Sequence, residues 1–437
     1  MVSNDDYSRA IAALFARQPT RMVPDLDRIT TLSELLGRPD QSYPAIQITG
    51  TNGKTTVTQM VACLLAALSV KAGSYTSPHL QDVRERIRIA GEPIERDELV
   101  AGLDYLDPYL AEVDARYPDL VTFFEVLTAL AFVHFADSPV DVGVFEVGLG
   151  GRWDATNLVR GDVAVLTTVS LDHDILGLTT EAIAGEKVGI IKPGAAVISA
   201  EQDPDVAAVI AGAAERADAQ LLVEGSDFSV ESRELAVGGQ LLTIRGVTGT
   251  VEDIYVPLHG EHQSRNAACA LAAVEGFLGF AGGLDSEVIR EGFAAVRSPG
   301  RLEVVRRHDA STVILDGAHN PAGAHALAIA LADEFAFRNR IVVLGVLSDK
   351  AVEGIVEELL PVASHVIVTE PPTSRAAPAE RLEKALRASG MTVEAAEDID
   401  AALELATGLA GEEDVVVVTG SLYTVGAARD ALGLPVL

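Results

Sequence analysis

"ITGTNGKTT", residues 48–56, carries two glycines, a lysine and a run of hydroxyl side chains directly after a short apolar stretch. The apolar stretch "AIQIT" ends within it and the helical pattern "TTVTQMVACLLAAL" starts at its end, so the loop joins a strand to a helix. Glycines in such a loop let several backbone N–H groups, and the positive end of the helix dipole, point at one place. The stretch therefore predicts a variant phosphate-binding loop, because Ile48 stands where the common pattern has its first glycine.

Each polar residue of this loop has an expected task in binding a nucleotide. Lys54 is expected to reach the outer phosphates, and the hydroxyl of Thr55 or Thr56 is expected to bind Mg²⁺. The predicted nucleotide-binding residues are Gly50, Thr51, Asn52, Gly53, Lys54, Thr55 and Thr56.

Apolar runs alternate with helical patterns along most of the chain, as in "VDVGVFEVG", "DVAVLTTVS" and "AAVISA". This alternation predicts a mostly parallel sheet with helices on both faces. Residues 219–258 differ, since "QLLVEG", "DFSVES" and "QLLTIRG" are short and punctuated by glycine, which predicts a small appended antiparallel sheet.

A second α/β series follows the hinge-like "RSPGR", with strands expected in "TVILDG", "IVVLGVL", "HVIVTE" and "DVVVVTG". We therefore predict an α/β protein of two domains. Residues 1–297 form a P-loop-type domain with the antiparallel appendage, and residues 298–437 form a smaller Rossmann-like α/β domain.

The composition narrows the range of possible binding partners. The 437 residues contain 33 Lys and Arg against 64 Asp and Glu, a net charge of −31 that disfavours nucleic acids and anionic membranes. Cys63 and Cys269 lie far apart in apolar helical stretches, which predicts buried reduced thiols. The N-terminus "MVSNDDYSRA" lacks the basic and apolar regions of a signal peptide, so we expect a cytoplasmic protein, and a monomer.

Polar residues at the ends of other predicted strands point to a metal site. Glu146 ends "VDVGVFE", Ser77 and His79 follow the strand in "GSYTSPHL", and His173 follows "DVAVLTTVS". The carboxyl ends of parallel strands meet at one edge of a sheet, where open α/β sheets bind ligands. A carboxylate such as Glu146 at the end of an apolar strand needs a cation or several donors, whereas a histidine after a strand is more often a hydrogen-bonding residue.

Glu125 receives a structural interpretation instead. In "TFFEVLTALAF" it stands three residues after Thr122, the spacing of a helix capping box. We assign Glu125 no chemistry.

Several motifs together resemble one family. "GTNGKTT", "YTSPHL", "EVGLGGRWDATN", "SLDHDILG", "HGEHQSRNAACA", "DGAHNPAG" and "VTGSLYTVG" occur in the order seen in folylpolyglutamate synthases and bifunctional dihydrofolate synthases of the Mur ligase superfamily. The resemblance implies an ATP-dependent ligase that uses ATP, Mg²⁺, L-glutamate and a folate or dihydropteroate. The carboxylate attacks the γ-phosphate of ATP, and the amine of glutamate then displaces phosphate from the acyl phosphate.

The resemblance also implies roles for individual residues. The implied metal shell, for two Mg²⁺ ions, is Thr55 or Thr56, Ser77, Glu146, His173 and a carbamylated Lys187. Thr55 follows Lys54 as in cell-wall Mur ligases, where many folate relatives have glycine, so the choice between the two hydroxyls stays open. The implied catalytic residues are Lys54, His173, Lys187 and Arg301.

Further implied contacts lie on both domains. Asn266 resembles an adenine-side residue, and Arg301, Asp316 and His319 resemble ATP contacts of the second domain. A guanidinium such as that of Arg301 suits charge on a transferring phosphate. For the folate, the implied residues are Asp154 and Ala155 in "WDATN" and Arg84 in "RERIRI". Arg84, Arg86 and Arg88 either supply positive potential for the anionic substrate or form a solvated basic face.

Two other functions compete with this interpretation. Cell-wall Mur ligases normally carry a nucleotide-sugar-binding domain before the loop, whereas the loop here begins at Gly50. A nucleotide switch or ATP-gated binding module without ligase activity is disfavoured because the chain has no "NKxD" base-reading motif.

Overall fold

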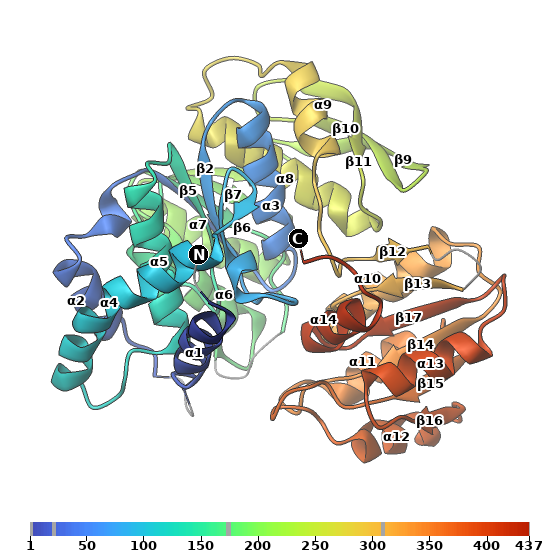
Figure 1. Cartoon of the computed structure of the whole chain (residues 1–437). Coiled ribbons are helices and arrows are strands. Elements are labelled where there is room, and N and C mark those ends of the chain that lie inside the picture. Colours follow the sequence, from blue (N-terminus) through green and yellow to red (C-terminus); the bar gives the residue numbers. More distant parts are fainter. Residues whose placement is uncertain (1–2, 20–22, 172–175, 307–310, 437) are drawn as a thin grey trace.

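The computed structural model describes residues 3–19, 23–171, 176–306 and 311–436. Within these ranges the strands form an eight-stranded, a three-stranded and a six-stranded sheet (Figure 1). None of the described helices is both long and apolar enough to cross a membrane.

The eight-stranded sheet has the order β4-β3-β2-β5-β1-β6-β7-β8. The six strands from β2 to β8 in this order run parallel, and β3 and β4 join antiparallel at one edge. Their bounds are β1 Ala45–Thr49, β2 Ala72–Tyr75, β3 Ile87–Ile89, β4 Glu92–Pro93, β5 Val142–Glu146, β6 Val163–Leu166, β7 Ala196–Ser199 and β8 Gln220–Val223. β1 is central, so the phosphate-binding loop leaves the middle of the sheet.

Helices cover both faces of this sheet, as its almost uniformly buried strands require. One core contains Ile46 and Ile48 of β1 with apolar residues of α3 Lys54–Ala67, α8 Glu261–Phe277 and α9 Ser286–Ala294. The opposite core contains Phe145 of β5 and apolar residues of α1 Asn4–Phe15, α2 Asp27–Leu35, α4 Arg96–Arg116 and α5 Phe123–Asp137. The helices α6 Thr180–Lys187 and α7 Pro204–Arg216 pack with β6 and β7.

The three-stranded sheet is antiparallel and packs on the core of α8 and α9. It consists of β9 Ser229–Ala236, β10 Gly239–Arg245 and β11 Thr250–Val256. The assignment of "QLLVEG" to this sheet was wrong: it forms β8, which pairs parallel to β7, for example Leu221 beside Val197. β8 is an edge strand, and an edge strand half open to solvent has the same alternating pattern as a small antiparallel strand.

The six-stranded sheet forms the second α/β unit, drawn orange to red in Figure 1, in the order β12-β13-β17-β14-β15-β16. Its strands are β12 Glu303–Val305, β13 Thr312–Leu315, β14 Arg340–Leu344, β15 His365–Val368, β16 Val393–Ala395 and β17 Val415–Thr419, all parallel except β12. Helices α10 Pro321–Asp333, α11 Val352–Leu359 and α12 Ala379–Ala388 cover one face; α13 Ile399–Leu409 and α14 Leu422–Ala431 cover the other. We propose that the domain boundary lies at residues 297–298, before β12.

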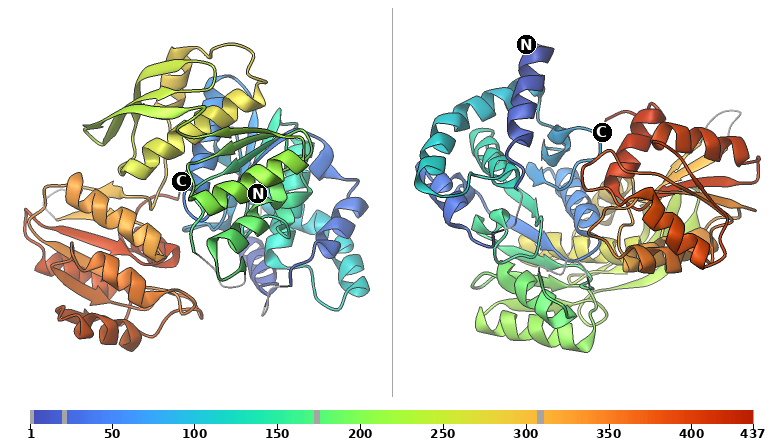
Figure 2. Two further views of the ribbon diagram at one scale, coloured as in Figure 1. Left: turned by 180° about the vertical axis from the view of Figure 1, so that it is seen from behind. Right: turned by 90° about the horizontal axis from the view of Figure 1, so that it is seen from below.

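The two α/β units meet at the loop after β2 (Figure 2). Arg429 of α14, only 1% exposed, donates to the Gln81 side chain at 2.8 Å and to the Pro435 carbonyl at 2.7 Å, and it pairs with Glu303. A Cβ atom on Gly426 would lie 2.1 Å from the Leu80 carbonyl oxygen. The loop is therefore held against the second unit by backbone contact as well as by hydrogen bonds.

Both cysteines carry free thiols, and the predicted burial is complete only for Cys269. Cys63 is partly buried on α3, and Cys269 is buried on α8. Burial raises the pKa of both thiols.

Candidate active site

The loop between β1 and α3 depends on two glycines. Gly50 has φ 151°, and a Cβ atom there would lie 1.8 Å from Oγ1 of Thr167. Gly53 has φ 88°, and a Cβ atom there would lie 2.6 Å from Oδ1 of Asn266. Both positions exclude larger residues, so the main chain of the loop stays close to β6 and α8.

Two lysines converge on the loop. Lys54 donates from Nζ to the carbonyls of Gly50 at 3.0 Å and Thr51 at 3.1 Å. Lys187, at the end of α6 and 2% exposed, donates from Nζ to the same Gly50 carbonyl at 2.7 Å. The structure thus brings a residue 137 positions away to the phosphate-binding loop.

Glu146 ends β5 beside this loop and is 1% exposed. Its carboxylate accepts a hydrogen bond from Thr55 Oγ1 at 2.8 Å and one from the Ser77 backbone N–H at 3.0 Å. Burial raises the pKa of Glu146, and the charge of Lys54 partly opposes this effect. The site therefore contains a desolvated carboxylate whose negative charge is only partly matched.

These groups offer hard oxygen donors, which suit Mg²⁺. Thr55, Glu146 and Ser77 lie together, whereas the predicted fourth member, His173, lies outside the described residues. In the described part of the chain, no three His, Cys, Asp or Glu side chains gather into a metal-binding group. The partly matched charge of Glu146 and its hydroxyl neighbour nevertheless fit an ion that keeps most of its ligands as water and phosphate.

The second α/β unit contacts the loop directly. Oγ1 of Thr56 lies 3.2 Å from Oγ of Ser298, and Asn320 donates from Nδ2 to Oδ1 of Asn52 at 3.1 Å. Asn320 is also the N-cap of α10, where its Oδ1 accepts from the Gly323 N–H at 2.7 Å. The N-terminus of α10 is thus fixed against the phosphate-binding loop.

The three second-domain residues predicted to bind ATP have different environments. Asp316 is buried and accepts from the backbone N–H groups of Leu302 at 2.8 Å and Ala318 at 2.9 Å; burial raises its pKa. His319 donates from Nδ1 to the Gly317 carbonyl at 2.7 Å. The guanidinium of Arg301 makes no hydrogen bond or ion pair with any residue in the described ranges, although its charge acts on Glu146 and Asp316.

The arginines of "RERIRI" lie in different environments in the structure. Arg84 pairs with Asp82 at 3.0 Å, so its charge is already matched. Arg86 is 6% exposed, donates from Nε to Nδ1 of His79 at 2.9 Å, and lies 5.1 Å from the centre of the Phe123 ring. Burial lowers the pKa of Arg86, and burial together with this guanidinium lowers the pKa of His79 to about 3.

Asp154 and Ala155, predicted to contact the folate, lie in the loop after β5. The Asp154 carboxylate accepts from the N–H of Leu149 at 2.9 Å and from the hydroxyl of Thr156 at 2.6 Å, and burial raises its pKa. It is also the N-cap of η3 Ala155–Leu158, and the Ala155 side chain is buried in the core of α5. Asp154 therefore fixes the shape of this loop.

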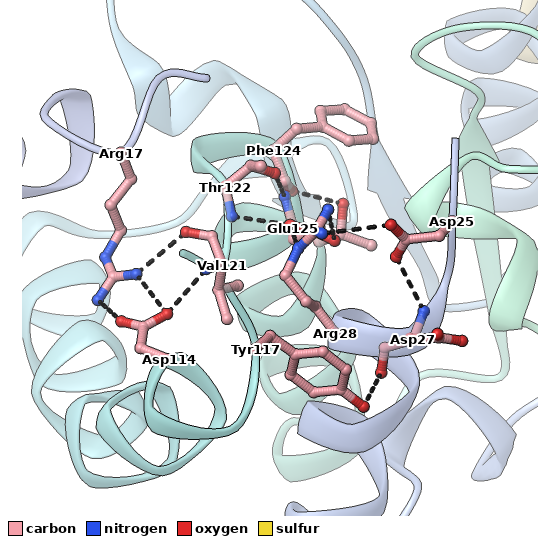
Figure 3. Close-up of polar contacts among 11 residues, drawn as sticks. Arg17, Asp25, Asp27, Arg28, Asp114, Tyr117, Val121, Thr122, Phe124 and Glu125 are labelled. Atoms are coloured by element: carbon pink, nitrogen blue, oxygen red, sulfur yellow. Dashed lines mark hydrogen bonds and ion pairs between the residues drawn. The ribbon is translucent and has the colours of Figure 1, made fainter. Parts of the chain in front are cut away.

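Glu125 has the structural role expected from its spacing (Figure 3). It forms a capping box with Thr122, whose N–H donates to Oε2 of Glu125 at 2.7 Å. Figure 3 also shows Arg28, which lies 3.2 Å from Glu125 and 3.4 Å from Asp25. The sequence gives no signal for this buried ion pair, because 97 residues separate its partners.

Three further residues at the loop were not predicted. Thr167, directly after β6, donates to the carbonyl of Asn52 at 2.7 Å, and Ser298 and Asn320 make the contacts described above. Asn320 had a readable signal, since "HNP" places an N-cap residue directly before a proline. Ser298 had none.

Comparison with known proteins agrees with this arrangement. A family model for the Mur ligase middle domain matches residues 48–274, and one for the Mur ligase glutamate ligase domain matches residues 300–422. The chain is 47% identical to the dihydrofolate synthase/folylpolyglutamate synthase of Mycobacterium tuberculosis, over 95% of this chain and 91% of that protein. It is 36% identical to the folylpolyglutamate synthase of Lacticaseibacillus casei, over 98% and 99% of the two chains.

Solved structures are similar over almost the whole length. The Mycobacterium tuberculosis folylpolyglutamate synthase complexed with ADP superimposes with a TM-score of 0.94, at 46% identity, over 99% of both chains. A complex named FPGS-AMPPCP-folate superimposes with a TM-score of 0.86, at 34% identity, over 98% of this chain and 99% of that one. The chain therefore belongs to the Mur ligase family, in the group of folylpolyglutamate synthases and dihydrofolate synthases.

Proposed function

We propose that this chain is an ATP-dependent ligase that joins L-glutamate to the carboxylate of a folate, of a dihydropteroate, or of both. The observation that carries the proposal is the contact between Thr55 and Glu146 at a glycine-dependent phosphate-binding loop. Phosphoryl transfer needs in-line positioning and neutralised charge, which the loop, Lys54 and Arg301 supply from opposite domains.

Thr55, Ser77 and Glu146 would hold Mg²⁺ at this edge of the sheet, with a second ion expected nearby. The bound ion would neutralise charge on the transferring phosphate. The Thr56 hydroxyl faces Ser298 at 3.2 Å while the Thr55 hydroxyl faces Glu146, which supports Thr55 as the ligand. His173 and a carbamylated Lys187 complete the proposed shell; the burial of Lys187 beside Gly50 supports its place there.

We propose that Arg86, rather than Arg84, provides the positive charge for the anionic substrate. Arg84 is neutralised by Asp82, whereas no carboxylate in the described ranges forms an ion pair with the buried Arg86. A buried cation without an anion favours the binding of one. Asp154 would act by shaping the loop that carries Ala155.

The nucleotide would lie between the two domains. Asn266 packs on Gly53, which supports its assignment to the adenine side of the loop. Asp316, through its two backbone hydrogen bonds, would hold the turn that presents His319 to the phosphates. L-glutamate as the second substrate, a monomeric state and a cytoplasmic location are further parts of this proposal.

Calorimetry of ATP binding with and without Mg²⁺ tests the nucleotide site, and phosphate release with glutamate plus either dihydropteroate or tetrahydrofolate tests the reaction. The expected result is Mg²⁺-dependent ATP binding and release of phosphate with at least one of the two acceptors. Turnover of UDP-muramoyl substrates without turnover of either pterin would instead identify a cell-wall ligase. ATP binding with no phosphate release in any assay would identify a binding module.

A further inference from the structure

His79 lies next to the proposed substrate-binding arginine, and neither the nucleotide site nor the metal site uses it. Nε of Arg86 donates to Nδ1 of His79 at 2.9 Å. An imidazole nitrogen that accepts a hydrogen bond carries no proton, so the proton of the neutral ring is on Nε2. The geometry thus fixes the tautomer of His79.

The guanidinium of Arg86 is held by Phe123 and His79, and the buried Tyr75 hydroxyl is a further hydrogen-bond partner of the side chain. Phe123 lies 5.1 Å from its carbon atom, and His79 binds its Nε. With Nε engaged, the two terminal NH₂ groups form the remaining edge, the pair of donors that binds a carboxylate in a bidentate manner. His79 thereby sets the rotation of this edge about the side chain.

His79 itself is fixed by its surroundings. Its ring meets Phe15 edge to face at 6.2 Å, and Phe15 packs on Phe123 at 5.1 Å. The backbone of the turn closes through the Thr76 N–H, which donates to the Arg86 carbonyl at 2.9 Å. The acceptor nitrogen therefore occupies a defined position before any ligand binds.

We infer that His79 is a positioning residue, whose Nδ1 atom orients the Arg86 guanidinium to bind the carboxylate of the folate or dihydropteroate substrate. This inference rests on the proposed function. It predicts that substrate binding depends on a hydrogen-bond acceptor at the Nδ1 position of residue 79 and not on the aromatic ring.

Three substitutions distinguish the contribution of the hydrogen-bond acceptor from that of the aromatic ring. His79→Asn places an oxygen near the Nδ1 position, His79→Gln places one near Nε2, and His79→Phe keeps an aromatic ring without an acceptor. We expect Phe and Gln to raise KM for the pterin substrate about 10-fold or more, with KM for ATP unchanged and kcat little changed. Asn should stay within about 3-fold of wild type.

A double-mutant cycle tests whether His79 affects substrate binding only through Arg86. Arg86→Met should itself raise KM, and adding His79→Phe to it should cause no further change, because His79 acts only through Arg86. Additive effects, a His79→Phe enzyme with wild-type KM, or an Asn variant as impaired as Phe would each overturn the inference. If wild type turns over neither pterin, the proposed function fails at that step, before any variant is compared.

Nitrogen-15 NMR of the imidazole gives a readout that does not depend on activity or on stable variants. The expected spectrum of wild type shows His79 with an unprotonated Nδ1 and a protonated Nε2. The opposite tautomer would show that Arg86 is not bound to Nδ1 and would also overturn the inference.

Discussion

Thr55 Oγ1 lies 2.8 Å from a carboxylate oxygen of Glu146, whereas the hydroxyl of the next residue, Thr56, faces Ser298 at 3.2 Å. Two adjacent hydroxyls therefore point to different partners, one in the proposed metal site and one on the other domain.

This difference predicts different consequences of removing each hydroxyl. Thr55→Val should lower the affinity for Mg²⁺ about 10-fold or more, because a metal-site oxygen is lost. Thr56→Val should leave Mg²⁺ dependence unchanged and cost about 1 kcal/mol of stability. Turnover measured against Mg²⁺ concentration, with thermal unfolding of both variants, checks the pair; a shift of Mg²⁺ dependence in Thr56→Val alone would assign the ion to the other hydroxyl.

Glu146→Gln is expected to abolish most activity and yet to stabilise the metal-free protein by about 1 kcal/mol at neutral pH. Burial raises the pKa of Glu146 above 4.5, so ionising it costs the folded state stability. Below pH 4.5 the carboxyl is protonated in both the folded and unfolded states, and the variant gains nothing. As the pH rises through the folded-state pKa, wild type loses stability and the advantage of glutamine reaches its full value.

Thermal unfolding in EDTA from pH 4 to pH 8 measures this difference. The opposite change at another buried position of the central sheet, Gln47→Glu, serves as the control for adding a buried charge, and this variant should lose stability as the pH rises. A Glu146→Gln variant less stable than wild type at every pH would contradict the prediction.

Lys187→Ala should lower kcat about 10-fold or more, and short-chain carboxylates should restore part of the loss if the wild-type side chain is carbamylated. Lys187→Arg is the matched control, since it keeps a donor for the Gly50 carbonyl but does not form the carbamate. An arginine variant as active as wild type would count against carbamylation. Electron density at Nζ in a crystal structure gives the direct answer.

Glu125→Gln should destabilise the protein by about 3 kcal/mol, because it leaves the buried cation of Arg28 without its main partner. The kcat per folded molecule should stay close to that of wild type, since Glu125 caps a helix and has no part in the chemistry. Asp114→Asn breaks the ion pair with Arg17 shown in Figure 3, whose side chains are more exposed than those of Arg28 and Glu125, and its cost should be about 1 kcal/mol. Chemical unfolding and turnover of both variants give the comparison; equal losses of stability would show that burial does not control the cost.

Much of the architecture was predictable from local sequence. Strand-like and helical patterns identified the central strands of both α/β units, because buried parallel strands form continuous apolar runs. The prediction for β8 was wrong because β8 is an edge strand and has no continuous apolar run. Its half-exposed pattern fits an edge strand of a parallel sheet as well as a strand of a small antiparallel sheet. The site was predictable where a motif is contiguous, as in the loop of residues 48–56.

Local sequence was enough to predict the loop of residues 48–56, the strand ends around it and the capping role of Glu125, since each depends on residues a few positions apart. The packing of distant segments settled two further points: within the described residues Arg86 is buried without an ion-pairing carboxylate while Arg84 pairs with Asp82, and Ser298 and Asn320 reach the loop from the second α/β unit. The physical reason is that burial and charge pairing depend on which distant segments pack together, and local spacing carries no information about that.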